Sequence, residues 1–447
     1  MDLDAIVLGA GPAGLSTASA LARRGGSVAV IDPAARSGGA VHTVKEDGWR
    51  VELGPNTLQL ESKLDADLLG ELGLAKEIQE ADVRGAKRLI ANQGHIHALT
   101  SNPRSILNSE LLSWRGKFNL LLEVFQPRES IQGETVRSFA ERRFGTEVAD
   151  RLFDPMINGI HAGDPGRLVL EYAFPSLARL ESDHRSILLG LWRSPSEPRK
   201  IVQFAGGLHR LTEAMVGQLP KGALHLQSTT TLIRRDSRGW NVAWRNALGE
   251  ESGAHAKSLI ITAPPWQWAH LACGEILKPV LHAAEIVEAP PVALVVRGYE
   301  RGQVQHPLDA FGLLVPHSEG RKVLGVLFPS STFPNNTPDG SVQLACFIGG
   351  ARNIALGRLD DDQLREVVDA ELGDLLGVKG APKKEWIARW PRAIPQYTHQ
   401  HGRFLEALAA TEALHSGLHF VGSFRGGISL MSTLRRGSEL GSRLPRG

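Results

Sequence analysis

Apolar and polar positions at the start of the chain follow the order strand, turn, helix, strand. The apolar run "AIVLGAG" precedes "PAGLSTASALARRGG", which has helical spacing, and a second apolar run, "SVAVIDP", follows. Gly25 and Gly26 end the predicted helix, because glycine adopts the left-handed conformation without steric cost. A β-α-β unit of this kind predicts parallel strands in an α/β domain.

Helical periods replace this pattern after residue 84. In "ELLSWRGKFNLLLEVFQP" the apolar residues recur every three to four positions, which predicts one face of a helix that ends before Pro127. These residues are Leu111, Trp114, Phe118, Leu121, Leu122 and Phe125. The stretch "GTEVADRLFDPMINGI" predicts another helix, with Thr146 as its N-cap.

Strand patterns return near residue 201. "IVQFAGGLHRLTEAMVGQL" predicts a strand, a glycine pair and a helix, and three strand runs follow: "LHLQSTTTLIRRD", "WNVAWRN" and "SLIITAP". Residues 280–400 combine the strand runs "PVALVVRGY" and "SVQLACFIGG" with a helix over "DDQLREVVDAELGDLLG", and the α/β pattern reappears at 418–440. We therefore expect one α/β unit to be assembled from three separated segments.

Length, charge and cysteine content narrow the class of protein. A chain of 447 residues exceeds the usual size of a single hydrophobic core, so two or three lobes are expected. Its 50 basic and 48 acidic residues nearly cancel, which disfavours nucleic acid as a partner. Cys273 and Cys346 are far apart, so we expect no disulfide, no metal site and a reducing, cytoplasmic location. No apolar run is long enough to predict a transmembrane helix. The first predicted strand begins within a few residues of Met1, so we expect no secretory signal peptide.

The glycines Gly9, Gly11 and Gly14 form a GxGxxG motif between the first strand and helix. The first permits a tight turn, the second lets a pyrophosphate approach the backbone, and the third lets helix and strand pack closely. Asp32, at the end of the second strand, is placed to accept hydrogen bonds from a ribose. The motif predicts a dinucleotide site, with an ordinary glycine-rich turn as the alternative.

After Asp32, Arg36 with the Gly38-Gly39 pair resembles the RxGG signature of the FAD-containing amine oxidase superfamily. Further stretches resemble the FAD-dependent protoporphyrinogen oxidases: "VELGPNTLQ", "DPMINGIHAGDP", "FAGGLHRL", "PLDAFGLLVP", "WPRAIPQY" and "VGSFRGGIS". The resemblance implies an α/β and α+β fold with three parts. These are a Rossmann-like FAD-binding domain (1–84, 200–270 and 415–447), a mixed-sheet substrate-binding domain (85–95 and 271–414) and an inserted helical lobe (96–199).

The resemblance also implies an activity and a substrate site. It implies the six-electron oxidation of protoporphyrinogen IX to protoporphyrin IX in haem biosynthesis, by hydride transfer to N5 of non-covalently bound FAD. Arg88 matches the arginine that binds a propionate, and Gly159 matches a glycine whose carbonyl lines the reacting face. Phe311, Leu314 and Phe347 match apolar walls around the macrocycle. We interpret His161 as a packing histidine.

The FAD contacts that the resemblance implies come from all three segments of the FAD-binding domain. The residues are Gly9, Gly11, Pro12, Ala13, Gly14, Asp32, Pro33, Arg36, Gly38, Gly39, Gly54, Pro55, Asn56, Thr57, Thr230, Ala263, Gly422, Ser423, Gly427, Ile428 and Ser429. Gly426, Gly427 and Ile428 are expected to begin a helix whose N–H groups face the flavin pyrimidine.

Several alternatives stay open. The substrate could instead be coproporphyrinogen III, which carries four carboxylates, or the chain could be another FAD-dependent amine or carotenoid oxidase. Ala40, His42 and Ser423 depart from the family pattern, which leaves a non-catalytic flavin-binding partner as a third reading. For 96–199, peripheral contact with the inner face of the cell membrane is one expectation and packing on its own protein the other. Hand-over of the product to a chelatase is a further expectation, and the sequence leaves the oligomeric state open.

Overall fold

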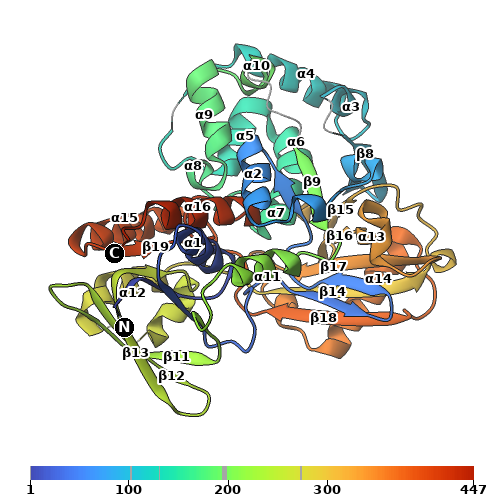
Figure 1. The fold of residues 1–447 in the computed structure, drawn as a ribbon. Helices are drawn as coiled ribbons and strands as arrows, with labels where there is room; N and C mark the ends of the chain where they lie inside the picture. Colours follow the sequence, from blue (N-terminus) through green and yellow to red (C-terminus); the bar gives the residue numbers. More distant parts are fainter. Residues whose placement is uncertain (1, 101–102, 130, 194–198, 272–273, 447) are drawn as a thin grey trace.

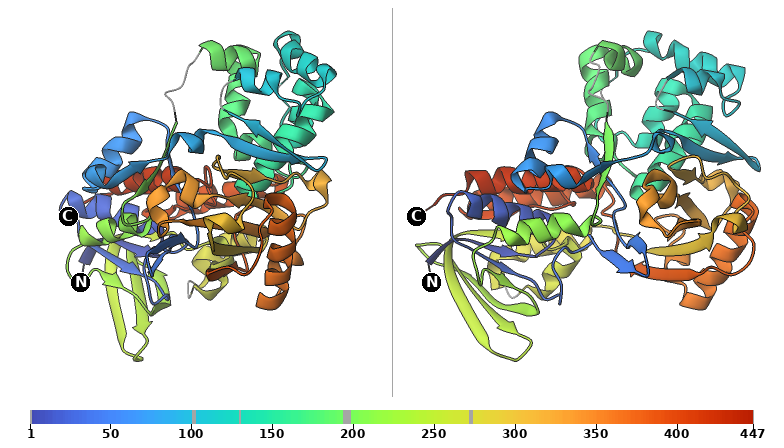
Figure 2. Two further views of the ribbon diagram at one scale, coloured as in Figure 1. Left: turned by 90° about the vertical axis from the view of Figure 1, so that its right-hand side faces the viewer. Right: turned by 45° about the vertical axis from the view of Figure 1, so that its right-hand side comes forward.

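The computed structural model describes residues 2–100, 103–129, 131–193, 199–271 and 274–446. It is a mixed α/β protein built from two seven-stranded sheets and a group of helices that lies above them in Figure 1 (Figures 1 and 2). The fold class is therefore as predicted. Cys273 lies outside the described residues, and Cys346 is buried.

The first sheet has a parallel centre that draws strands from all three predicted segments. Its order is β10-β2-β1-β13-β12-β11, and β19 also pairs with β13. The strands β10, β2, β1, β13 and β19 run parallel to one another, whereas β12 and β11 complete an antiparallel meander. The bounds are β1 (Asp2–Leu8), β2 (Val28–Ile31), β10 (Leu224–His225), β11 (Ser228–Arg235), β12 (Trp240–Asn246), β13 (Glu251–Ile261) and β19 (Leu418–Phe420).

Helices cover both faces of this sheet. On one face, α1 (Pro12–Arg23) packs tightly against α16 (Leu430–Arg443), and α11 (His209–Gly217) lies beside α1. Gly437 permits this approach, because a Cβ there would lie 2.6 Å from the carbonyl oxygen of Ala13. On the other face, α12 (Lys278–Glu285) and α15 (His399–Leu414) share the sheet's hydrophobic core. The predicted boundaries assign these last two helices to the substrate-binding domain; the boundaries themselves stay a prediction.

The second sheet has the order β18-β14-β17-β16-β15-β7-β8. Helix α14 (Asp361–Leu376) packs its apolar side on this sheet. Its strands are β7 (Arg88–Asn92), β8 (His95–Leu99), β14 (Val292–Glu300), β15 (Gly312–Leu314), β16 (Val323–Leu327), β17 (Ser341–Gly349) and β18 (Lys384–Trp390).

Two small sheets join the two large ones. They consist of β3 (Thr43–Glu46) with β4 (Trp49–Glu52), and of β5 (Leu58–Leu60), β9 (Lys200–Phe204) and β6 (Ile78–Glu80). The short helices α2 (Lys63–Glu71) and α13 (Pro329–Thr332) lie near these connections. The predicted strand, glycine pair and helix over 201–219 is observed as β9 and α11, although β9 belongs to a small sheet.

Residues 103–193 form the helical lobe at the top of Figure 1. Its helices surround a core that includes Phe139, Phe144 and Ile157. The bounds are α3 (Pro103–Asn108), α4 (Trp114–Leu122), α5 (Val136–Phe144), α6 (Thr146–Val148), α7 (Asp154–His161), α8 (Leu170–Ala173), α9 (Pro175–His184) and α10 (Ile187–Arg193). In the described part of the chain, no helix combines the length and apolarity needed to span a bilayer.

Two helix predictions in this lobe need correction. The helix predicted over 111–125 is shorter: Ser113 caps α4 by accepting the N–H of Gly116 at 3.2 Å, and a 3-10 turn follows Leu122. Thr146 is not an N-cap but the first helical residue, because Gly145, at φ +86°, makes the break between α5 and α6.

Candidate functional site

In the turn between β1 and α1, neighbouring atoms leave no space for a side chain at Gly9 and Gly14, whereas the space beside Gly11 is open. A Cβ on Gly14 would overlap the carbonyl oxygen of Gly9, and one on Gly9 would lie 2.6 Å from the Thr262 hydroxyl. A Cβ on Gly11 would meet no atom within 4 Å. Gly11 caps α1 without a side-chain hydrogen bond, so no capping group competes for the N–H groups of the first turn. These features fit the diphosphate of a dinucleotide.

Asp32, at the end of β2, ties this turn in place. Its Oδ2 accepts the Ala10 N–H at 2.6 Å and its Oδ1 accepts the Ala34 N–H at 2.8 Å. Each carboxylate oxygen has a second lone pair, so Asp32 can still accept from ribose hydroxyls. The Ser228 N–H donates to the Asp32 carbonyl at 3.0 Å, which brings the start of β11, and with it Thr230, to this edge of the sheet.

A second glycine turn lies against the first. The Gly38 N–H donates to the carbonyl of Ala10 at 2.7 Å, and a Cβ on Gly39 would lie 3.2 Å from the Cα of Gly11. Both Gly38 and Gly39 have positive φ angles, +101° and +53°, which other residues rarely adopt. Two predicted cofactor segments, 9–14 and 36–39, are thus brought into contact.

The Arg36 side chain stabilises this second turn by hydrogen bonds to the backbone of the turn. The guanidinium donates to the carbonyl oxygens of Val41 at 3.0 Å and Gly39 at 2.8 Å. Burial lowers the pKa of Arg36, and the carboxylate of Asp32 partly offsets the shift. The side chain therefore keeps a positive charge beside both glycine turns.

The segment 54–57 lies next to the same turns. A Cβ on Gly54 would overlap the carbonyl oxygen of Ala40, so this position requires glycine. Within the segment, the Asn56 side chain donates to the Gly54 carbonyl at 3.1 Å. The structure therefore gathers the predicted cofactor residues of the first segment around one edge of the sheet.

The C-terminal segment reaches this edge too, but without the predicted helix start. Because β19 runs parallel to β13, Gly422 and Ala263 follow the carboxyl ends of neighbouring strands. Helix α16 begins at Leu430 with Ser429 as its N-cap. The prediction that a helix starts at Gly426–Ile428 is wrong, because Gly426 and Gly427 adopt φ angles of +73° and +115° and form a turn.

Arg88, the first residue of β7, places a cation in the second sheet. Its guanidinium lies 4.1 Å from the centroid of the Phe311 ring and donates to the carbonyl oxygens of Gly85 and Lys87. Burial alone lowers its pKa to about 10, and no described carboxylate contributes to the shift. A half-buried arginine without an acidic partner fits a ligand that carries a carboxylate.

Gly159 and Leu314 face one another between helix α7 and strand β15. A Cβ on Gly159 would clash with the Cδ2 atom of Leu314, so glycine at this position lets Leu314 pack directly against α7. Phe347, in β17, packs near Ala162, the residue that ends α7 in the left-handed conformation. The predicted wall residues and Gly159 thus lie around one region, close to the strand β7 that carries Arg88.

His161 is buried on the other side of α7. Its ring meets Phe174 edge-on at 5.3 Å and Tyr397 at 6.3 Å between centroids. Burial lowers its pKa to about 4, so the imidazole is neutral near pH 7. These contacts agree with a packing histidine.

Sequence reasoning missed two side chains near the C-terminal turn, Tyr397 and Arg436. Tyr397 accepts the Gly427 N–H at 3.1 Å, and Arg436 donates to the Gly427 carbonyl at 2.8 Å. The motif "WPRAIPQY" contains Tyr397, so a signal existed without a role attached to it. No sequence signal pointed to Arg436, because its contact depends on how α16 folds back over the turn.

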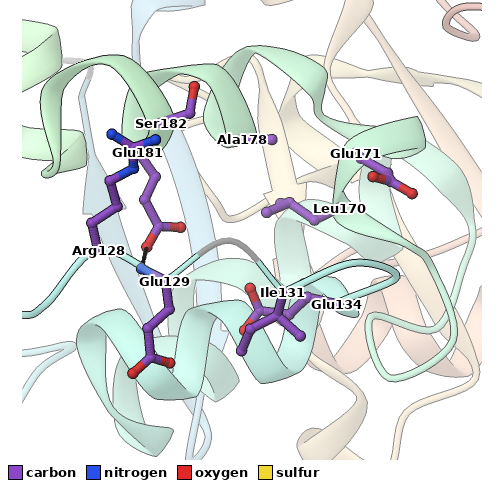
Figure 3. A pocket seen from close by; sticks show the side chains of 9 residues that line it. All are labelled: Arg128, Glu129, Ile131, Glu134, Leu170, Glu171, Ala178, Glu181 and Ser182. Atoms are coloured by element: carbon purple, nitrogen blue, oxygen red, sulfur yellow. Dashed lines mark hydrogen bonds between the residues drawn. The ribbon is translucent and has the colours of Figure 1, made fainter.

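A hollow on the helical lobe lies apart from this site (Figure 3). Four glutamates line the hollow, and Arg142 forms ion pairs with two of them, at 2.8 Å to Glu134 and 2.9 Å to Glu181. None of the predicted cofactor or substrate residues lines it. The lining residues are Arg128, Glu129, Ile131, Glu134, Leu170, Glu171, Ala178, Glu181 and Ser182.

Comparison with known proteins gives family, relatives and fold. The profile of the family "Flavin containing amine oxidoreductase" matches residues 12–429. The mitochondrial protoporphyrinogen oxidase of Nicotiana tabacum is 32% identical, over 96% of this chain and 92% of that protein. The coproporphyrinogen III oxidase of Bacillus subtilis is 24% identical, over 91% of this chain and 89% of that protein. A crystal structure from Exiguobacterium sp. 255-15 has the same fold, with a TM-score of 0.81, 19% identity and coverage of 98% of both chains.

Proposed function

This chain belongs to the flavin containing amine oxidoreductase family, and on this premise we propose that it oxidises protoporphyrinogen IX to protoporphyrin IX in haem biosynthesis, with non-covalently bound FAD. Membership of the family makes it a flavin-dependent oxidoreductase. The similarity to the tobacco protoporphyrinogen oxidase extends over nearly the whole of both chains, which supports the same substrate class.

The residues around the glycine turns fit FAD. Gly11 leaves the N-terminus of α1 open, and the turns at 9–14 and 36–39 lie in contact with a positive charge on Arg36. When bound, FAD supplies the hydride acceptor, so that six electrons leave the macrocycle in three two-electron steps and oxygen or another acceptor restores the oxidised cofactor. The chain's own residues bind, orient and exclude water.

The single observation that carries the substrate proposal is the state of Arg88. A cation that is half-buried, stacked on Phe311 and without an acidic partner among the described residues is costly to keep unless a carboxylate binds there. A propionate could accept two parallel hydrogen bonds from this guanidinium, which would fix the register of the macrocycle. Leu314 and Phe347 offer apolar surface nearby, and Gly159 lets the Leu314 side chain pack directly against α7.

Coproporphyrinogen III is the second candidate, favoured by the similarity to the Bacillus subtilis enzyme. It carries four carboxylates, for which a more cationic face is expected. Of the residues predicted for substrate binding, Arg88 alone is cationic. We therefore prefer the substrate with two carboxylates.

The test supplies both porphyrinogens to the purified flavoprotein. Each is prepared anaerobically, oxygen is admitted, and porphyrin fluorescence is followed against an enzyme-free control. We expect acceleration with protoporphyrinogen IX. Preference for coproporphyrinogen III would replace the substrate, and no acceleration with either would overturn the function and favour an amine or carotenoid oxidase or a non-catalytic flavoprotein.

We also propose that the protein works at the cytoplasmic face of a membrane, where its product passes to a chelatase. Support comes from exposed apolar side chains on α4, the turn after it and α10, which are elements of the helical lobe at the top of Figure 1; we call this group of side chains the apolar tip. Trp114 is 85% exposed and Trp192 78%. The apolar tip consists of Trp114, Phe118, Leu121, Phe125, Leu191 and Trp192.

Lys117 adds a positive charge to the apolar tip, with its amine 4.9 Å from the centroid of the Trp114 ring. Exposed aromatic side chains next to cations are typical of helices that lie in the interface of anionic bilayers.

A further inference from the structure

Gln396 and Tyr397 are consecutive buried residues whose side chains reach two different parts of the site. The Gln396 amide donates to the carbonyl of His161 at 2.9 Å, at the C-terminal end of α7. The Tyr397 hydroxyl contacts the turn that follows β19 instead. The first contact lies two residues from Gly159, which packs against Leu314 of the predicted substrate wall, and the second lies in the segment predicted to bind flavin.

The Tyr397 hydroxyl bonds two points of the C-terminal turn at once. It donates to the carbonyl of Ser423 and accepts the N–H of Gly427, at 3.1 Å. Burial raises the pKa of Tyr397 to about 12, so the hydroxyl keeps the proton that the first bond needs. The Tyr397 side chain thus links the two ends of the segment from Ser423 to Gly427.

Arg436 holds the other side of the same turn. Its guanidinium donates to the carbonyl oxygens of Gly426 and Gly427, the latter at 2.8 Å. The N–H of Gly427 therefore bonds Tyr397 while its carbonyl bonds Arg436. Because both glycines have positive φ angles, this turn would otherwise have wide conformational freedom.

The backbone of Tyr397 and its ring are themselves fixed. Its carbonyl accepts the Val169 N–H from the helical lobe at 2.8 Å, and its ring stacks on His401 at 4.3 Å between centroids. The next residue but one, His399, begins α15, which packs on the first sheet. The dipeptide thus stands where the helical lobe, the flavin segment and the end of α7 meet.

We propose that Gln396 and Tyr397 are positioning residues that set where the substrate face of α7 lies relative to the flavin turn at 423–427, with Arg436 as the counter-anchor of that turn. The assignment of α7 to the substrate and of the turn at 423–427 to the flavin rests on the proposed function. Chemistry between two bound rings depends steeply on their separation, and a misplacement of about 1 Å can lower a rate about 100-fold. Groups that fix the turn also fix the dipoles that stabilise negative charge on a reduced flavin.

The test separates the two side chains by what each should change. Tyr397→Phe removes both hydroxyl bonds; the flavin should stay bound, its midpoint potential should fall, and the rate constant for flavin reduction by substrate should fall about tenfold with little change in KM. Gln396→Met keeps the side-chain length but loses the amide. It should lower the same rate constant and leave the potential unchanged.

Tyr172→Phe is the matched control, because Tyr172 also meets the His401 ring, edge-on at 6.0 Å between centroids, and no hydrogen bond among the described residues joins its side chain to the turn. It should change neither quantity. Where Tyr397→Phe does not retain flavin, Arg436→Lys tests the turn through its other anchor, and the potential should again shift.

Two results would overturn the proposal: an unchanged potential in both turn variants, or a Gln396→Met enzyme with the kinetics of Tyr172→Phe. Lower thermal stability with unchanged potential and kinetics would assign the three residues to packing alone. The midpoint potential is measured by dye equilibration without porphyrinogen. A wild-type protein that oxidises neither porphyrinogen would therefore overturn the proposed function while the role of Tyr397 at the turn was still decided.

Discussion

The Arg88 guanidinium lies 4.1 Å from the centroid of the Phe311 ring, and this cation–π contact leaves the positive charge of Arg88 unneutralised. Phe311 itself is joined to the base of β7, since its N–H donates to the carbonyl of Lys87 at 2.9 Å. The cation and the apolar wall are thus parts of one unit, and a ligand with both a carboxylate and a flat ring fits it.

Replacing Arg88 with alanine should weaken substrate binding and leave the flavin in place. Hydrogen bonds to charged groups contribute about 1.5–3 kcal/mol, so KM should rise about 10- to 100-fold. Steady-state kinetics and the flavin-to-protein absorbance ratio measure the two effects. Arg84→Ala is the control, because Arg84 is exposed and already paired with Asp82. Loss of flavin in Arg88→Ala, or an unchanged KM, would show that Arg88 has a structural role.

A methyl group on Gly159 should obstruct the substrate face. In Gly159→Ala the new Cβ would meet Leu314, which must then move into the space proposed for the macrocycle. We expect kcat/KM to fall at least about tenfold while the fold is kept. Gly70→Ala is the control, since Gly70 is also helical and a Cβ there meets nothing within 4 Å.

The double variant Gly159→Ala/Leu314→Ala sharpens this test. Removal of the Leu314 side chain frees the space that the methyl group occupies, so part of the lost activity should return. Equal activities of the single and double variants would contradict a steric effect at this contact.

Local patterns predicted the two ends of the flavin-binding unit well. The glycine motif at 9–14 and the strand and helix runs over 4–33 specify a β-α-β unit, and the run "SLIITAP" predicts part of the strand observed as β13, because turn chemistry and periodicity act over a few residues. The pairing of β19 with β13 could be expected only through the family resemblance. Nothing in the residues 418–420 alone specifies a partner strand some 160 positions away.

Long-range contacts account for what the sequence did not predict. Gly426 and Gly427 precede a helix in the sequence, but two anchors outside the turn hold them in a left-handed conformation: Tyr397, from before β19, and Arg436, from α16. The apolar residues of 111–125 have helical spacing, yet spacing cannot tell whether such a face packs inward or stays exposed. In the structure Leu111 is fully buried while Trp114 and Phe118 are exposed.

Glu52 should make the stability of the protein depend on pH. It is 4% exposed, and burial raises its pKa from 4.5 to about 7, against hydrogen bonds from Leu208 N–H and Thr43. Between these values the native state holds a proton that the unfolded state has lost. The free energy of unfolding should therefore decrease as pH rises from 4.5 to 7, by about 3 kcal/mol, and should lose no more above pH 7 on account of this group.

Urea unfolding of Glu52→Gln at pH 5, 6 and 7 checks this expectation. Glutamine keeps the shape of a neutral carboxyl group, so the difference in the free energy of unfolding between the wild type and the variant should change across the window. Glu366→Gln, at an exposed position, should run parallel to the wild type. A constant difference between Glu52→Gln and the wild type would show that Glu52 is ionised throughout.

The apolar tip of the helical lobe should bind anionic bilayers. Burying an aromatic side chain contributes about 1.5–3 kcal/mol, so Trp114→Ser/Phe118→Ser should lower the bound fraction in a vesicle flotation assay at least about tenfold. Leu248→Ser/Leu414→Ser is the matched control, because these leucines are 83% and 74% exposed but lie outside the helical lobe. Since Lys117 and Arg115 flank Trp114, neutral vesicles should bind less protein than anionic ones. Protein that stays wholly in the soluble fraction, or that loses binding equally in both double variants, would contradict a membrane contact at this tip.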